Sequence, residues 1–270
     1  MKKLVYICFM LLCVVVLSMG FTACNEAEPT PEPEAEVVVE TEPEEEVPTV
    51  EAEPEPEPEP EAVQEPEDRG PVSILFVGNS FTFYGDVPGQ LQTLAGAQGI
   101  EVTYKDISRG GATLSDSRAN AIEEMEAGDF DYIVLQDQSM RPGVDFDGFL
   151  DDVQILSDAA RENGVTLVLF NPAAMDEEML QFILNLAYEQ AAEEVSAILI
   201  NAGGAWIYAD QTIPGLVPSK GGNQAFIAAC VFAATLFDLH ITEIPEGNRY
   251  NSDDAIALAQ AAWDFVRFSR

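Results

Sequence analysis

The sequence predicts a three-layer α/β/α fold, in which a five-stranded parallel sheet lies between two layers of helices. Five short segments rich in Ile, Leu, Val and Phe are nearly continuously apolar, as expected for strands that are covered on both faces. Segments with helical spacing of apolar residues alternate with them, and such alternation indicates right-handed crossovers within one sheet. The expected strands are residues 73–77, 101–106, 132–135, 165–170 and 197–200.

Helices are expected between and after these strands, and one edge of the sheet is the place to look for chemistry. In parallel α/β sheets, ligands bind beyond the carboxyl ends of the strands. We call this edge the rim. The expected helices cover about 86–98, 114–127, 147–163, 176–194, 221–239 and 252–268. The loops expected at the rim are 78–85, 107–113, 136–145, 171–174 and 202–220.

Composition divides the 270 residues into three zones. Residues 1–24 begin with two lysines and continue as an apolar run, which is typical of an export signal. Residues 25–70 hold 19 acidic residues and 10 prolines. Like charges and fixed backbone angles prevent a packed core there, so we expect a disordered linker. Residues 71–270 have the length and apolar content of a single domain.

A cysteine follows the apolar run almost directly. The small residues before Cys24 resemble a bacterial lipobox, in which the cysteine becomes a lipidated N-terminus after cleavage. An uncleaved membrane helix is the alternative, but the apolar run is short for a span and acidic residues follow it. We therefore expect a lipoprotein that is attached to the membrane through Cys24, lies outside the cytoplasm and carries its domain on the acidic linker.

The net charge and the small number of metal-binding side chains argue against several classes of function. Forty-eight acidic residues against 12 basic residues give a formal charge of −36, which repels nucleic acid. Four cysteines and one histidine exclude a disulfide framework and disfavour a Cys/His metal site. Neither a glycine-rich dinucleotide motif nor a Walker A loop follows the first strand. We expect no cofactor, no metal and no nucleic-acid partner.

Three rim loops carry residues suited to acyl chemistry. In the first loop, Gly78 lets the chain turn before Ser80, which leaves the hydroxyl exposed beside a helix entry. In the second loop, Gly110 and Gly111 allow backbone N–H groups to approach a ligand closely. In the third loop, the Gln138 amide is placed to donate a hydrogen bond to the same anion. Together these residues predict a nucleophile with donors for an oxyanion.

These loops resemble those of a known family. VGNSFTFYGDVP, ISRGGATL and DYIVLQDQS look like the first three blocks of the SGNH (GDSL-like) hydrolases, with GNS in place of GDS. AYEQAAEE, GAW and PSKGGNQAFIAACVFAATLF extend the resemblance to about residue 238. The resemblance implies a flavodoxin-like fold and cleavage of ester bonds, often those of acyl groups on sugars or lipids. It also implies that Ser80 is the nucleophile, that Gly110 or Gly111 is the oxyanion-hole glycine, and that Gln138 stands where the family has an asparagine.

The resemblance breaks where the family has an Asp and a His before its last core helix. Residues 212–224 contain neither, and the one histidine, His240, is expected on the order of 30 Å from the rim, at the C-terminal end of a helix. A serine hydroxyl needs a base to take its proton. Lys220 lies in the right loop, and Ser–Lys pairs act on other folds. A lysine base must be desolvated, however, and a solvated Lys220 is the simpler interpretation.

Two functions that use the rim remain open, beside a passive spacer or adhesion protein in which only the linker and the lipid matter. The first is a tethered ester hydrolase that acts through Ser80 on acylated carbohydrates, and that is weak or inactive without the family's Asp and His. The second is a binding module without turnover, in which Trp206 and Tyr208 could form a stacking wall for a sugar, although core packing is the expected role of Trp206. The partner of the Ser80 hydroxyl distinguishes them, because a base within hydrogen-bonding distance favours the hydrolase.

Overall fold

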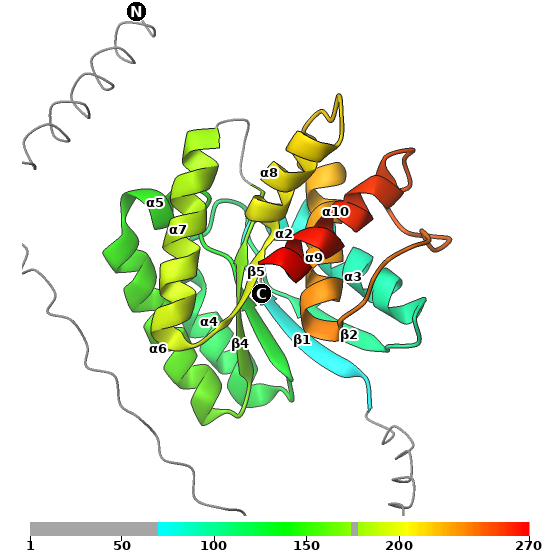
Figure 1. The fold of residues 1–270 in the computed structure, drawn as a ribbon. Coiled ribbons are helices and arrows are strands. Elements are labelled where there is room, and N and C mark those ends of the chain that lie inside the picture. Colours follow the sequence, from blue (N-terminus) through cyan, green and yellow to red (C-terminus); the bar gives the residue numbers. More distant parts are fainter. Residues whose placement is uncertain (1–69, 174–177, 270) are drawn as a thin grey trace, which may run out of the picture. The chain divides into compact units, whose positions relative to one another are not determined.

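The predicted sheet is confirmed. The chain is described by a computed structural model, whose described residues are 70–173 and 178–269 (Figure 1). The export signal, the lipidation site and nearly all of the linker expected from the sequence lie outside these residues. The strands are β1 (Val72–Val77), β2 (Val102–Asp106), β3 (Tyr132–Leu135), β4 (Thr166–Asn171) and β5 (Ile198–Asn201). All neighbouring strands are parallel, and their order is β2-β1-β3-β4-β5.

The six expected helices are present, with ends that differ by a few residues, and three further helices were not expected. The helices are α2 (Ser80–Phe83), α3 (Val87–Gly96), α4 (Leu114–Ala127), α5 (Arg141–Val144), α6 (Phe146–Glu162), α7 (Glu178–Val195), α8 (Ala202–Thr212), α9 (Asn223–Phe237) and α10 (Ala255–Phe268). The two short helices, α2 and α5, lie in expected rim loops. A single turn of helix leaves little apolar periodicity in the sequence.

The prediction of a loop over 202–220 is wrong in its first half, because α8 occupies it. Two adjacent glycines make this segment a poor helix former. The helix nevertheless begins cleanly, since the Asn201 side chain accepts a hydrogen bond of 2.9 Å from the backbone N–H of Gly204. Ala202, Ala205 and Ala209 are fully buried on its inner face. Burial therefore overrides the weak local propensity.

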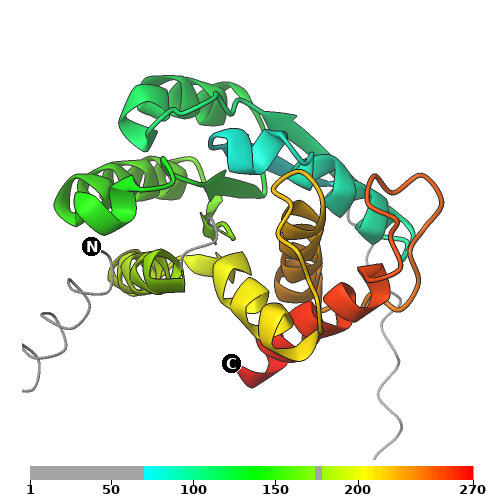
Figure 2. The same ribbon diagram turned by 90° about the horizontal axis from the view of Figure 1, so that it is seen from above.

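Two separate cores lie on the two faces of the sheet, as the nearly continuous apolar strands predict. In β1, Ile74 and Phe76 belong to the core beneath α3, α9 and α10, whereas Leu75 and Val77 belong to the core beneath α4, α6 and α7. Seen from above, the two helical layers flank the sheet (Figure 2). Alternate side chains of one strand thus anchor opposite layers.

The centre of one layer is α9, which is buried on all sides. Phe232 packs its ring 5.8 Å from that of Phe76 and 5.1 Å from that of Phe170. Burial also raises the pKa of the Cys230 thiol, as expected for an unreactive cysteine. Although α9 is strongly apolar, none of the helices within the described residues is both long and apolar enough to cross a bilayer.

Candidate active site

Ser80 is the first residue of α2, directly after β1, and its neighbour Asn79 fixes its position. The side chain of Asn79 is buried, and its oxygen accepts a hydrogen bond of 3.1 Å from the backbone N–H of Phe81. Its amide nitrogen donates to the carbonyl of Asp137 at 2.8 Å, and its backbone N–H donates to the Gln136 side chain at 3.0 Å. Asn79 therefore ties the nucleophile loop to the loop after β3, a role that sequence reasoning missed.

Gly78 is required by close packing at the end of β1. A Cβ atom at this position would lie 2.4 Å from Thr82 Oγ1 and 3.0 Å from Gln136 Oε1. These two side chains already bond to each other, since the Thr82 hydroxyl donates to Gln136 Oε1 at 3.1 Å. Any larger residue would push α2 away from the loop after β3. The turn that presents Ser80 thus depends on the absence of a side chain at position 78.

The hydroxyl of Ser80 has a base candidate within hydrogen-bonding distance. Lys220 Nζ donates to Ser80 Oγ at 2.7 Å and lies 4.0 Å from the centre of the Phe81 ring. Both Ser80 and Lys220 are half-buried. Desolvation lowers the pKa of Lys220 below the usual 10.5, which is the direction that a lysine base needs. In the described parts of the chain, no carboxylate forms an ion pair with Lys220, so no ion pair counteracts this lowering of the pKa.

The loop that carries Lys220 is held by the start of α9. The buried side chain of Asn223 accepts a hydrogen bond from the backbone N–H of Ser219 at 2.8 Å and donates to the carbonyl of Val217 at 2.9 Å. On the other side, the Tyr84 ring packs against Gly221 so closely that a Cβ there would lie 2.9 Å from it. The loop is therefore clamped between α9 and the end of α2. Asn223 was another residue without a role in the sequence interpretation.

The glycine loop after β2 lies against the loop that carries Ser80, so the structure brings these two rim loops together. The backbone N–H of Arg109 donates to the carbonyl of Gly78 at 3.0 Å. Gly111 has a φ of 72°, a conformation that only glycine adopts without strain. The backbone N–H groups of Ser80, Gly110 and Gly111 have no hydrogen-bond partner among the described residues. They are thus available to an anion at this part of the rim.

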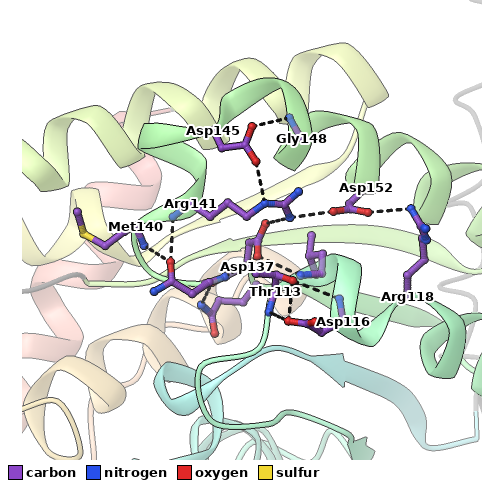
Figure 3. Close-up of polar contacts among 12 residues, drawn as sticks. Thr113, Asp116, Arg118, Asp137, Met140, Arg141, Asp145, Gly148 and Asp152 are labelled. Atoms are coloured by element: carbon purple, nitrogen blue, oxygen red, sulfur yellow. Dashed lines mark hydrogen bonds and ion pairs between the residues drawn. The ribbon is translucent and has the colours of Figure 1, made fainter.

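The side chain of Gln138 forms hydrogen bonds within its own loop through its amide oxygen. Its amide oxygen accepts hydrogen bonds from the backbone N–H groups of Met140 at 2.9 Å and Arg141 at 3.1 Å (Figure 3). These bonds close the turn that leads into α5. The amide nitrogen remains for a ligand, so a donor role for Gln138 stays a prediction.

A buried ion-pair cluster occupies the rest of the loop after β3 (Figure 3). Asp137 Oδ1 accepts from the backbone N–H groups of Leu114 at 3.0 Å and Gln138 at 2.6 Å, and Oδ2 pairs with Arg141 at 2.8 Å. Arg141 also pairs with Asp152 at 2.8 Å. Burial raises the pKa of the Asp137 carboxyl, and these hydrogen bonds offset part of the rise. Because its oxygens are occupied, Asp137 is not available as a base for Ser80.

The acidic groups of this cluster face a guanidinium rather than an empty site. Across residues 70–173 and 178–269, no group of three or more His, Cys, Asp and Glu side chains is arranged to hold a metal ion.

His240 takes no part in the site. It follows the end of α9 by three residues, rather than ending the helix as the sequence analysis expected. Its Nε2 shares a hydrogen bond of 2.9 Å with Gln260 Oε1, and its ring stacks on Trp263 with centroids 4.8 Å apart. Since α9 begins beside the Lys220 loop and rises ~1.5 Å per residue, His240 lies on the order of 20 Å from the rim.

Trp206 packs in the core, which is the role that the sequence favoured for it over a stacking wall for a sugar. Trp206 is only 7% exposed and belongs to the core beneath α9 and α10. Tyr208 is half-buried and packs against the same core.

Comparison with known proteins agrees with the fold. No family model and no curated protein matches the sequence. Among solved structures, a candidate SGNH hydrolase from Slackia heliotrinireducens aligns with a TM-score of 0.50 and 24% identity, over 62% of this chain and 100% of that chain. Two others are TesA (TM-score 0.47, 13% identity, 72% and 98% covered) and an acetyl-xylooligosaccharide esterase from a Geobacillus species (0.41, 16%, 72% and 92%). On the first of these likenesses, the chain has the fold of the SGNH hydrolases.

Proposed function

We propose that this protein hydrolyses carboxylic esters, with Ser80 as the nucleophile and Lys220 as the base. The observation that carries this proposal is the hydrogen bond of 2.7 Å between Lys220 Nζ and Ser80 Oγ. A nucleophile and a base within this distance, beside unpaired backbone N–H groups, are the minimum that acyl transfer requires. The fold of the SGNH hydrolases supports the same reaction class by analogy.

The reaction proceeds in two halves. Neutral Lys220 takes the proton from Ser80 Oγ while this oxygen forms a bond to the acyl carbon, and the carbonyl electron pair moves to the carbonyl oxygen. The N–H groups of Ser80 and of Gly110 or Gly111, with the Gln138 amide, stabilise that oxyanion. Protonated Lys220 then gives its proton to the leaving alcohol as the C–O bond breaks. Water repeats the sequence on the acyl-serine and releases the acid.

Turnover at neutral pH is slow for two reasons. Only the neutral form of Lys220 accepts the Ser80 proton, and desolvation alone lowers the pKa of this group, with no neighbouring charge that lowers it further. A catalytic base also works best when a third group orients it, and no described carboxylate pairs with Lys220. A positioned base contributes ~10²–10⁴-fold to such a reaction. We therefore expect a weak esterase whose rate rises with pH.

We infer further that the mature protein is a membrane-anchored lipoprotein outside the cytoplasm, and that its substrates are acylated carbohydrates. The sequence supports the first inference through the lipobox before Cys24 and the acidic linker that follows it. The resemblance to the SGNH hydrolases supports the second. Radiolabelled palmitate incorporation that is lost in Cys24→Ala tests the anchor, and acetate release from acetylated xylan or chitin fragments tests the substrate class.

The test of the reaction is covalent labelling of the full chain with a fluorophosphonate. We expect labelling at Ser80, found by peptide mass spectrometry and rising between pH 7 and about pH 9 as Lys220 loses its proton. Ser80→Ala should lose the label. Ser219→Ala removes an exposed hydroxyl next to Lys220 and should keep it. Absence of label at Ser80 over this pH range would refute the hydrolase.

A glycan-binding module without turnover is the second candidate, and one observation favours it. Lys220 has no carboxylate partner among the described residues, so its charged form is available to hold a ligand as well as to donate to Ser80. Glycan-array binding that survives Ser80→Ala, in a chain that fails to react with the fluorophosphonate, would establish this alternative.

A further inference from the structure

One face of α7 carries four large apolar side chains that are exposed to water. Met179, Phe182, Ile183 and Leu186 follow the i, i+3, i+4, i+7 spacing of a single helical face. Their exposed fractions are 61%, 57%, 39% and 51%. Val144, which ends α5, is 74% exposed. The residue before it, Gly143, lies against Ile183. We call Val144, Met179, Phe182, Ile183 and Leu186 the α7 patch.

The α7 patch is not explained by the packing of the domain. The opposite face of α7 is already buried, with Leu184 and Tyr188 each about 1% exposed in the core. Single exposed apolar residues are common on soluble proteins, but a contiguous group that follows one helical face marks an interaction site. Such a group is unexpected on a domain with 29 acidic and 9 basic residues.

The same face of α7 changes character abruptly beyond Leu186. Its next two turns present Glu189, Gln190 and Glu193, all exposed. The half of the helix nearest the rim is therefore apolar, and the half farther from it is acidic. A binding partner that lies along α7 therefore contacts apolar side chains at the rim end of the helix and negative charge at the other end.

We propose that the α7 patch docks an amphipathic helix of another protein, with an apolar segment that covers Met179 to Leu186 and a basic segment beside Glu189 and Glu193. Helix-in-groove recognition uses apolar anchors at this spacing, and the apolar side chains supply the affinity. The carboxylates at one end set the direction of the bound helix.

Charge argues against the other occupants. A second copy of this chain would bring a further net negative domain against Glu189 and Glu193, which repels it. An anionic lipid surface is repelled for the same reason. A basic helix is attracted, because it neutralises the carboxylates while its apolar face covers the α7 patch.

The test uses two synthetic helical peptides and the full chain. Both peptides have a leucine face; one carries lysines at one end of that face, and the other carries glutamates at the same positions. We expect calorimetry at physiological salt to show binding of the lysine peptide only. The double substitution Phe182→Ser and Leu186→Ser should weaken it roughly tenfold or more. Hydrogen exchange should show protection of α7 amides in the unsubstituted chain when the peptide binds.

Matched controls separate the α7 patch from the acidic linker, which also attracts a basic peptide. Ile256→Ser removes an apolar side chain of similar exposure (45%) from α10 and should leave the affinity unchanged. Glu193→Gln should weaken binding several-fold, whereas Glu162→Gln on α6 should not.

Three outcomes overturn the proposal. The first is equal affinity of the lysine peptide for the unsubstituted chain and the Phe182/Leu186 variant. The second is equal binding of the lysine and glutamate peptides. The third is a dimer of the unsubstituted chain in sedimentation velocity that the same double substitution dissociates, which would assign the α7 patch to a second copy.

Discussion

Two polar groupings lie on neighbouring rim loops of this domain, and they differ in how completely they are satisfied. Around Asp137 and Arg141, the carboxylate oxygens of a fully buried side chain meet backbone N–H groups and a guanidinium. At Ser80, the hydroxyl has one partner, Lys220, and the ammonium group has only that hydroxyl and the Phe81 ring among its described contacts. We call the first grouping closed, because its carboxylate oxygens are all paired. We call the second grouping open, because the backbone N–H groups beside Ser80 have no partner among the described residues.

The contrast shows which rim residues hold the structure and which are available for chemistry. A buried carboxylate whose hydrogen bonds are complete is held firmly in position. An incompletely paired lysine beside a hydroxyl retains the freedom to exchange a proton. Both carboxylates of the third loop, Asp137 and Asp145, pair with Arg141, so neither is available to orient Lys220.

The largest effect is expected on the stability of the domain, when the ion pair between Asp137 and Arg141 in the closed grouping is broken. Arg141→Met would leave Asp137 buried without its counter-charge and remove one of the two arginines that pair with Asp152. Breaking a buried ion pair from one side reduces the free energy of unfolding by about 3–5 kcal/mol. Urea denaturation should show this loss.

The matched control is Arg161→Met, which removes an exposed arginine that pairs with Asp158. An exposed pair contributes about 0–1 kcal/mol, so this variant should differ little from the unsubstituted chain. Similar stability of the two variants would show that the Asp137–Arg141 grouping is not structural, and the contrast between the two rim groupings would fail.

The open grouping should respond in turnover rather than in stability. Lys220→Met removes the base from Ser80 and should lower kcat/KM for p-nitrophenyl acetate by ~10²–10⁴-fold, with the urea midpoint nearly unchanged. Lys220→Arg keeps a positive charge that does not dissociate below about pH 12, so it should be as inactive as Lys220→Met. An active Lys220→Arg variant would assign Lys220 an electrostatic role instead.

The pH dependence of turnover also tests whether Lys220 acts as the base. Burial lowers the pKa of Lys220, and the neutral amine is the form that accepts the Ser80 proton. Below this pKa the neutral fraction grows about tenfold per pH unit, so kcat/KM should rise with pH and level off once the lysine is neutral. Stopped assays from pH 6 to about pH 10 measure the profile. A rate that falls with rising pH would mean that charged Lys220 is the active form.

The smallest effect is expected at the one histidine. His240→Ala removes a hydrogen bond to Gln260 and a ring stack on Trp263, which together contribute about 1 kcal/mol to stability. Turnover should stay within about twofold of the unsubstituted chain, because the ring is remote from Ser80. A large loss of turnover with little loss of stability would reverse the assignment of the base.

The sequence predicted most of the fold because its strands are nearly continuously apolar and its long helices carry apolar residues at helical spacing. The five strands and six helices were found at nearly the expected residues. The helix α8 was not expected, and its two adjacent glycines give this segment a weak helix propensity. Their effect on helix stability, ~1 kcal/mol each, is outweighed by burial of Ala202, Ala205 and Ala209, which local pattern does not reveal.

Part of the candidate site also followed from the sequence, and part did not. Ser80 and the glycine pair were predicted because a Gly before a Ser at a strand end has a specific backbone meaning. The roles of Asn79 and Asn223 could not be foreseen, since each acts by bonding to residues that are remote in sequence or in an irregular loop. The asparagine directly before Ser80 is visible in the sequence. Because asparagine is a common helix N-cap, it is a signal that could have been used.

By itself, the sequence determined the five strands and six of the helices, the acidic charge and the presence of a serine between glycine-rich turns, because these depend on composition and local pattern. Only the tertiary structure decided that Lys220 reaches Ser80 across 140 positions of the chain, and that Asp137 is occupied by Arg141. Whether a side chain is solvated or desolvated depends on what other segments pack around it, and that packing fixes its proton affinity.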